Sequence, residues 1–257
     1  MNRNRVTVRA VAVALLAAGL AAGPAVAAPA PAEAKARVGA DWDTQSIVFT
    51  AADGQANDLQ IFSMYTADGV RRIGFTDVVP LEPGDHCAYS REGETTSVTC
   101  ELPVDGPRPD RIDVSLGDGD DTISAFDPGM GTVSGGPGDD ELHAHTARKV
   151  LGDAGNDMVM GAAALYGGDG MDELMGDHAN QQMWGGPGDD MIHGYGGDDI
   201  VYAGQGDDHA MGGDGRDIIL GGPGSDTLEG EGDNDLILGG SGKDVLKGGP
   251  GRNIVLP

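Results

Sequence analysis

The 257-residue chain is poor in aromatic side chains, in basic side chains and in cysteine. Aromatic residues make up 4% of it, and 16 Lys and Arg stand against 42 Asp and Glu, for a formal net charge of −26 at pH 7. Nucleic acid or an anionic membrane surface would repel such a chain, so neither is expected as a partner. The excess of acidic residues instead favours cations as partners, and the positions of these residues in the sequence indicate which cation is bound.

Apolar runs long enough to cross a bilayer are missing, so no membrane span is expected. The first residues, MNRNRVTVRAVAVALLAAGLAAGPAVA, have a basic front, an apolar run too short and too rich in Ala and Gly for an anchor, and small residues at Ala25 and Ala27. This pattern is typical of a secretory signal peptide cleaved after Ala27 and predicts a secreted, extracellular protein. Cleavage would remove three Arg and no acid, which takes the formal charge from −26 to −29.

The only two cysteines are Cys87 and Cys100, and the CxxC spacing of metal and redox sites is absent. An exported chain meets oxidising conditions, so we expect one disulfide between them, the alternative being two free thiols. The sequence also lacks the HExxH motif of zinc proteases and the GxSxG motif of serine hydrolases. The histidines at 143, 145, 178, 193 and 209 fall on different expected strands and turns, so solvated surface is expected there rather than a zinc site.

Composition divides the chain into four segments. Residues 1–27 are the expected signal peptide, and residues 28–37 (APAPAEAKAR) are typical of a flexible linker. Residues 38–112 contain strand-like runs such as QSIVFTA and LQIFSMY between turn signals such as ADGQAND and EPGD, which predicts a small β-rich region with the Cys87–Cys100 disulfide. Residues 113–257 are dominated by glycine and aspartate in a repeating pattern.

A nine-residue unit recurs ten times without a gap from Gly167 to Leu256. Looser units precede it at 116–121 (LGDGDD), 135–140 (GGPGDD) and 152–157 (GDAGND). Their starts are 19, 17 and 15 residues from the next unit of this series, against 18 for two regular repeats. The array therefore extends over roughly 113–257.

Units such as GGDGMDEL, GGPGDDMI, GGDGRDII, GGPGSDTL and GGSGKDVL resemble the RTX, or hemolysin-type, nonapeptide family, whose repeat is GGxGxDxUx with U apolar. The resemblance extends over more than half of the chain. It implies an all-β protein in which a parallel β-roll that binds several Ca²⁺ ions follows the small disulfide-bonded β-rich region.

The residues of the repeat agree with this fold. Glycines in the first six positions allow positive φ and a close approach of carbonyl oxygens, as a tight turn requires. The last three positions form a short strand whose middle residue points inward. These inward residues are Leu174, Met183, Ile192, Val201, Ala210, Ile219, Leu228, Ile237, Leu246 and Val255.

Successive strands go to opposite sheets, so turns on the same edge are two repeats apart and stack at the spacing of parallel strands, roughly 4.8 Å. Carboxylates about 5 Å apart repel by roughly 3 kcal/mol per pair at an effective dielectric near 20. A divalent cation between adjacent turns would turn this repulsion into ligation. Carboxylate and carbonyl oxygens favour Ca²⁺, whereas Mg²⁺ prefers to keep its waters.

The candidate Ca²⁺ ligands are the aspartates in the sixth position of the turns. One edge is expected to carry an unbroken file of Asp121, Asp140, Asp157, Asp172, Asp190, Asp208, Asp226 and Asp244. The other edge lacks the pattern at its start, regains it with Asp199, Asp217 and Asp235, and ends with Asn253. We expect up to seven ions on the first edge and two or three on the second.

The outward positions of one sheet are also apolar, and they include Tyr166, Trp184, Tyr202, Leu220, Leu238 and Leu256. A strand that is apolar on both sides is expected where both faces are covered. We therefore expect this face to be buried by the N-terminal region, by a second copy or by a ligand, the alternative being a merely apolar surface.

These observations predict a secreted calcium-binding protein with a structural or adhesive role, and no enzyme. The alternative is a small secreted hydrolase, or an enzyme remnant, with a calcium-binding C-terminal roll, because rolls of the resembling family often follow a protease or lipase domain. Against it, only about 75 residues remain outside the roll, and no catalytic motif is found in them.

Overall fold

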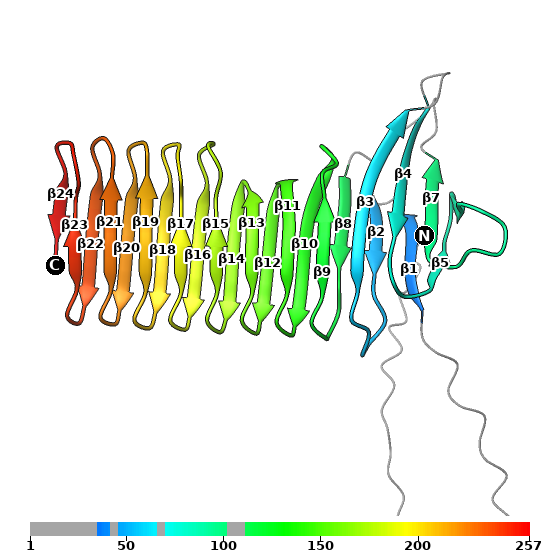
Figure 1. Ribbon diagram of the computed structural model, residues 1–257, viewed down its shortest axis with the longest axis horizontal. Helices are drawn as coiled ribbons and strands as arrows, with labels where there is room; N and C mark the ends of the chain where they lie inside the picture. The colour runs from blue at the N-terminus through cyan, green and yellow to red at the C-terminus, as the bar shows by residue number, and fades with distance from the viewer. Residues whose placement is uncertain (1–34, 42–45, 66–69, 102–110) are drawn as a thin grey trace, which may run out of the picture. The chain divides into compact units, whose positions relative to one another are not determined.

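The computed structural model describes residues 35–41, 46–65, 70–101 and 111–257, of which residues 41, 64 and 65 are described in backbone only (Figure 1). The predicted signal peptide and most of the predicted linker lie outside the described residues. Residues 34–257 form one compact unit. Its described part consists of strands and turns, with no helix, and so contains no helix that could cross a membrane.

Two sheets of twelve strands make up this unit, and we call them sheet A and sheet B. Sheet A contains β1 (Ala36–Asp41), β2 (Ser46–Thr50), β5 (Leu81–Pro83), β8 (Arg111–Ser115), β10 (Met130–Pro137), β12 (Lys149–Ala154), β14 (Ala164–Asp169), β16 (Gln182–Pro187), β18 (Ile200–Gln205), β20 (Ile218–Pro223), β22 (Leu236–Ser241) and β24 (Ile254–Leu256). Sheet B contains β3 (Asp58–Tyr65), β4 (Arg71–Thr76), β6 (Cys87–Tyr89), β7 (Ser97–Glu101), β9 (Thr122–Ala125), β11 (Glu141–Ala147), β13 (Met158–Ala162), β15 (Glu173–Met175), β17 (Met191–His193), β19 (His209–Gly213), β21 (Thr227–Glu231) and β23 (Val245–Lys247).

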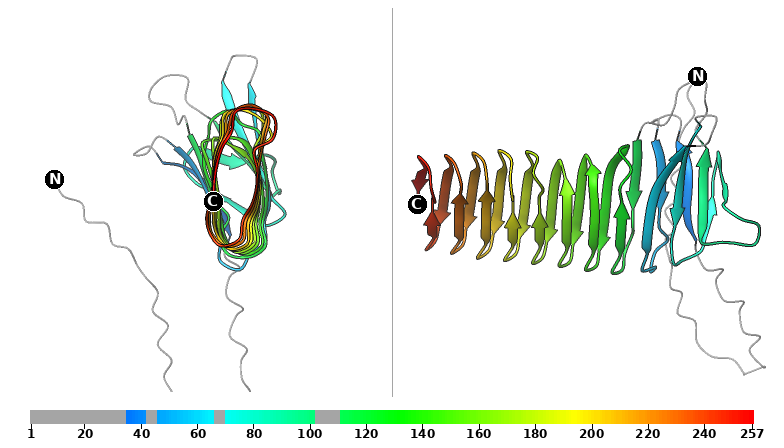
Figure 2. Two further views of the ribbon diagram at one scale, coloured as in Figure 1. Left: turned by 90° about the vertical axis from the view of Figure 1, so that its left-hand side faces the viewer. Right: turned by 45° about the horizontal axis from the view of Figure 1, so that its top comes forward.

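From β8 and β9 onward the chain winds as a parallel β-roll. Each strand pairs in parallel with the strand two places later, as β16 does with β18 and β17 with β19, while consecutive strands lie in opposite sheets. Figure 2 shows each coil nearly end-on as a flattened oval with one sheet along each long side. The predicted all-β fold class and parallel roll are confirmed.

The core is the thin layer between the two sheets. Its residues are the predicted inward ones, and Leu174, Met183, Ile192, Val201, Ala210, Ile219, Leu228 and Ile237 are all fully buried. In the last described coil Leu246 is partly buried and Val255 is 38% exposed. One row of apolar side chains from each sheet therefore fills the space between them.

The sheets continue without a break into the N-terminal region. Strand β2 pairs in parallel with β8, and β3 pairs in parallel with β9, so these two strands form a coil ahead of the repeats. Antiparallel partners then extend both sheets, and the predicted disulfide Cys87–Cys100 joins β6 to β7. The predicted boundary at residue 113 falls within β8, and the division into segments stays a prediction.

The outer face of sheet A carries the predicted apolar row. Tyr166, Trp184 and Tyr202 stack on consecutive strands with ring centroids 4.3 and 5.6 Å apart, and the Lys149 ammonium lies over the Tyr166 ring. Tyr202 is 41% exposed, so the described residues do not bury this face. The predicted covering by a second copy or a ligand stays a prediction.

Candidate metal centre

The turns owe their shape to glycines at positions where the side chain of any other residue would collide with a neighbouring coil. In the turn 185–190, Gly186 and Gly188 have φ of 126° and 144°, which L-residues rarely adopt. A Cβ on Gly188 would lie 1.6 Å from the carbonyl oxygen of Gly170 in the preceding coil of the same edge. Backbone carbonyls therefore point along the roll from one turn toward the next.

A ladder of aspartates runs along one edge, and we call it the long ladder. At each step a sixth-position backbone N–H donates to Oδ1 of the sixth-position aspartate in the next turn of that edge, at 2.6–3.1 Å. Its acceptors are Asp121, Asp140, Asp157, Asp172, Asp190, Asp208, Asp226 and Asp244. This edge thus brings together all eight residues predicted for it.

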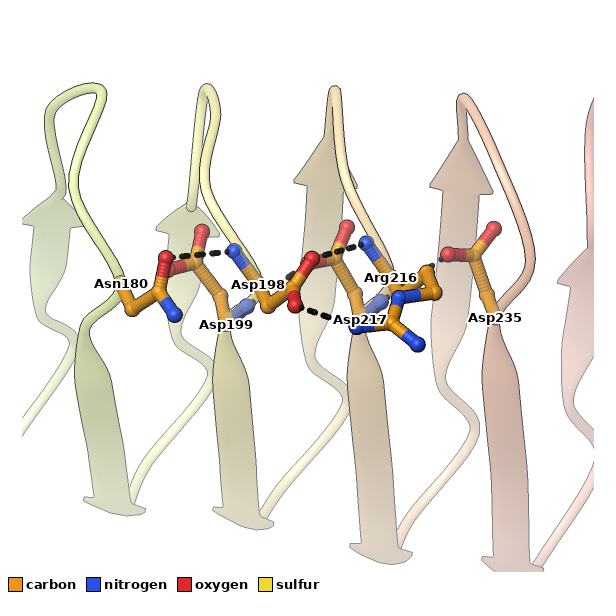
Figure 3. Close-up of polar contacts among 6 residues, drawn as sticks. All are labelled: Asn180, Asp198, Asp199, Arg216, Asp217 and Asp235. Atoms are coloured by element: carbon orange, nitrogen blue, oxygen red, sulfur yellow. Dashed lines mark hydrogen bonds and ion pairs between the residues drawn. The ribbon is translucent and has the colours of Figure 1, made fainter.

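The opposite edge holds a short ladder of the same kind. Gln181 N–H donates to Asp199 Oδ1, and the series continues through Asp217 and Asp235 to Asn253, at 2.7–3.1 Å. Figure 3 shows Asp199, Asp217 and Asp235 of this ladder, with their carboxylates side by side on successive coils. The three predicted aspartates of this edge therefore also stack.

Each ladder aspartate except Asp244 uses one carboxylate oxygen in the ladder and buries the other. The second oxygen, Oδ2, has no hydrogen-bond partner among the described residues at Asp121, Asp140, Asp157, Asp172, Asp190, Asp208 and Asp226 of the long ladder and at Asp199, Asp217 and Asp235 of the short ladder. These ten side chains are at most 3% exposed. Buried polar atoms are normally hydrogen-bonded, so a repeated set of unpaired oxygens indicates a missing positive group.

The space in front of these oxygens is lined by a second acceptor. A Cβ on Gly185 would lie 2.2 Å from Asp190 Oδ2 and 2.3 Å from the carbonyl oxygen of Ala203, the first residue of the next turn on that edge. The same pair of oxygens surrounds Gly135, Gly152, Gly167, Gly194, Gly221 and Gly230. Two acceptors that face each other without a donor fit a hard cation.

In one turn of the same series, an asparagine amide donates to the carbonyl oxygen that has no donor in the aspartate turns. Asn57 stands first in the long ladder, and its Nδ2 donates to the carbonyl oxygens of Leu116, at 3.0 Å, and Gln55, at 3.3 Å. Leu116 is the first residue of its turn, as Ala203 is of its own. The Asn57 amide therefore supplies the donor that the aspartate turns lack.

Burial raises the pKa of the ten buried ladder carboxyls, and neighbouring carboxylates add to the effect for most of them. The pKa rises from 3.8 to about 7 at Asp140, Asp190 and Asp217, and to about 6 at Asp121, Asp157, Asp199 and Asp208. The pKa values of Asp172, Asp226 and Asp235 are also raised by burial. Ionised carboxylates are thus unfavourable in these turns unless a cation compensates them.

A second, exposed ladder runs through the fifth positions in the opposite direction. Asp198 N–H donates back to Asn180 Oδ1 at 2.9 Å, and Arg216 N–H donates back to Asp198 Oδ1 at 3.0 Å (Figure 3). The Arg216 guanidinium also pairs with Asp198. The hydrogen bond from the Arg216 backbone N–H, followed by that from the guanidinium, holds the pKa of the Asp198 carboxyl below its usual value. Each turn is therefore tied to both of its neighbours.

Sequence reasoning missed Asn57, Gln181 and the fifth-position ladder. The 18-residue offset aligns Gln181 with Asp199 and could have revealed it, whereas Asn57 lies in ADGQAND, which resembles an ordinary turn. At the irregular start of the second edge, Asp127 is buried, accepts from Gly129 N–H at 2.7 Å and pairs with Arg71. In the described part of the chain no three His, Cys, Asp or Glu side chains lie close enough together to hold a metal ion. Each candidate ion site therefore combines one aspartate carboxylate with backbone carbonyl oxygens.

Comparison with protein families agrees with this geometry. The family described as RTX calcium-binding nonapeptide repeat (4 copies) matches residues 179–210, 211–246 and 220–255. The resemblance predicted from the sequence is thereby confirmed for the C-terminal region. None of the curated proteins matches the chain.

Proposed function

We propose that this chain, whose C-terminal region consists of RTX calcium-binding nonapeptide repeats, binds a file of Ca²⁺ ions along each edge of its roll and folds as it binds them. The observation that carries the proposal is the set of ten buried Oδ2 atoms without a hydrogen-bond donor. Up to seven ions on the long ladder and three on the short ladder would satisfy them.

The residues that would hold each ion are the sixth-position aspartate and the first residue of the next turn on that edge. Asp190 would contribute Oδ2 and Ala203 its carbonyl oxygen, while Asp190 Oδ1 keeps its bond from Asp172 N–H. Bound Ca²⁺ would supply the positive charge and accept these hard oxygens as ligands. Asp244 and Asn253, in the last turns, would close the two files.

Folding is coupled to binding because the metal-free turns bury charge without compensation. The chain has a formal net charge of −26, and its ladder carboxylates must come together for the coils to stack. Stacking is favoured when these carboxylates have a counter-charge, and binding free energy then becomes folding free energy. With dissociation constants of about 10⁻⁴–10⁻³ M, typical of extracellular modules, the roll would form only where the Ca²⁺ concentration is high.

The signal-peptide pattern of residues 1–27 supports secretion, and the absence of catalytic motifs supports a structural or adhesive role without enzymatic activity. The stacked repeats provide a long, regular surface for such a role.

Circular dichroism of the chain in chelator and in Ca²⁺, together with equilibrium dialysis, tests the proposal. We expect strand signal to appear with Ca²⁺, little response to Mg²⁺, and a stoichiometry near ten ions per chain. A chain that folds fully in chelator, or one that binds one or two ions, would contradict the proposal.

A further inference from the structure

The outer face of sheet B differs from that of sheet A in its sulfur content. Strands β13, β15, β17 and β19 carry five of the ten methionines of the chain at outward positions, together with two histidines. We call this set the Met–His face, and it consists of Met158, Met160, Met175, Met191, His193, His209 and Met211. The residues between them, Val159, Leu174, Ile192 and Ala210, are fully buried.

The register of the strands places three of these side chains in one line. Met175 is opposite His193, and His193 is opposite Met211, across β15, β17 and β19. Neighbours in such a line are roughly 4.8 Å apart at the backbone. Met191 precedes His193 by two residues on the same strand and points to the same side, so His193 has a thioether side chain on three sides.

Two contacts show that side chains converge around His193. The Tyr195 ring stacks on the His193 imidazole with centroids 5.9 Å apart, and the Tyr195 hydroxyl donates to Met175 Sδ at 3.8 Å. Tyr195 adopts φ of 68°, an unusual conformation for a tyrosine, in the turn that follows β17. The backbone of this turn therefore directs the ring back over the line of Met175 and His193.

Thioether and imidazole groups are soft or borderline ligands, and together they select Cu(I) rather than Ca²⁺ or Mg²⁺. Methionine has three rotatable bonds beyond its backbone, so sulfur atoms on adjacent strands can move toward one ion. His193 is half-buried and Met191 is 46% exposed, so an ion can reach the line from solvent. The strong negative charge of the chain favours the approach of any cation.

We propose that Met175, His193 and Met211, with Met191 beside them, form a binding site for one Cu(I) ion on the outer face of sheet B. This site is separate from the aspartate ladders, because it lies on the wall of the roll and they lie on its two edges. Calcium affects it only by stabilising the coils that bring β15, β17 and β19 together.

Competition for Cu(I) tests the site. The chain is first saturated with Ca²⁺, its fold is verified by circular dichroism, and Cu(I) is then added without oxygen in the presence of a chromophoric Cu(I) chelator. We expect one Cu(I) per chain to be withdrawn from the chelator. The double variant Met175→Leu/Met211→Leu should bind about 100-fold or more weakly, since loss of even an outer partner of a metal ligand typically costs 10–100-fold.

Met171→Leu is the matched control, because Met171 is 61% exposed but lies in a turn outside the Met–His face. The affinity of this variant for Cu(I) should equal that of the parent chain. His193→Asn should weaken binding as the double variant does, and X-ray absorption should report both sulfur and nitrogen around the copper. A folded chain that leaves Cu(I) with the chelator, or a double variant that binds as tightly as the parent, would overturn the site. A chain that fails to fold in Ca²⁺ would instead contradict the proposed calcium function.

Discussion

Replacing Asp190 by asparagine should stabilise the chain in the absence of calcium, and this gain should shrink when calcium is added. Asp190 Oδ1 accepts from Asp172 N–H at 2.9 Å, and the introduced asparagine can keep this bond through its own Oδ1. Its amide nitrogen would then replace the unpaired Oδ2 and donate toward the Ala203 carbonyl. Asn57 already makes this arrangement with Leu116 O at 3.0 Å in its own turn.

The magnitudes follow from what each condition leaves unsatisfied. In chelator, Asp190→Asn removes one buried unpaired carboxylate oxygen, and such a group costs about 1–3 kcal/mol. The variant should therefore be more stable than the parent by about this amount. In Ca²⁺ at about 10 mM, loss of one site with a Kd of about 10⁻⁴–10⁻³ M removes roughly 1.4–2.7 kcal/mol of binding free energy. This loss is set against the gain seen in chelator, so the advantage of the variant over the parent should shrink by roughly 1.4–2.7 kcal/mol when Ca²⁺ is added.

Urea unfolding followed by circular dichroism measures both free energies of unfolding, with a stabilising osmolyte added to all samples in chelator. Equilibrium dialysis should in parallel report about one ion fewer per chain. Asp189→Asn is the matched control, because the Asp189 side chain is the exposed neighbour and its Oδ1 accepts from Asp207 N–H at 2.8 Å, a bond that asparagine preserves. If Asp190→Asn destabilises the chain equally in both conditions, the unpaired oxygen is no cation ligand and the reasoning fails.

Three further perturbations test the same structure. First, seven of the ladder carboxyls have pKa values raised from 3.8 to about 6–7 in the metal-free fold, so their contribution to stability is full below about pH 4 and is lost as the pH rises through 6–7. Strand signal in chelator should therefore be stronger near pH 5 than near pH 8, and the order should reverse in Ca²⁺, where protons compete with the ion. Second, Gly188→Ala should lower the free energy of unfolding in Ca²⁺ by about 3 kcal/mol or more in urea titrations, because its Cβ would meet Gly170 O at 1.6 Å, whereas Gly39→Ala, whose nearest contact would be 3.5 Å, should cost less than about 1 kcal/mol. Third, Cys87→Ser/Cys100→Ser should destabilise the N-terminal region by about 2–4 kcal/mol in thermal unfolding and leave the number of bound calcium ions unchanged.

The fold of the repeats could be predicted because one short pattern fixes it at every turn. Glycine, aspartate and one apolar residue return every nine positions, so the inward file from Leu174 to Ile237 and both aspartate ladders follow from counting. The disulfide was predictable because the chain offers one pair of cysteines.

The rest depends on contacts that counting does not reveal. Strands β2 and β3 form a coil ahead of the repeats although their sequences lack the nonapeptide. A strand can pair in parallel with β8 or β9 without this repeat, because pairing needs only alternating side chains and a free sheet edge. Asn57 enters the long ladder from this coil for the same reason. The role of Tyr195 depends on the conformation of one turn residue, and glycine occupies the same position in most units.

The side-chain amide of Asn57 indicates the end of the roll at which folding should begin. In a stack whose units contact their nearest neighbours, a unit that needs no ion to face the next turn is the one on which the others can be added. The coil of Asn57 is such a unit, since the Asn57 amide donates to the Leu116 carbonyl and its strands join the disulfide-linked end of the sheets. Order should therefore spread from this end toward the last repeats as ions arrive, so shortening the array would remove ion sites while the seed of the roll survives.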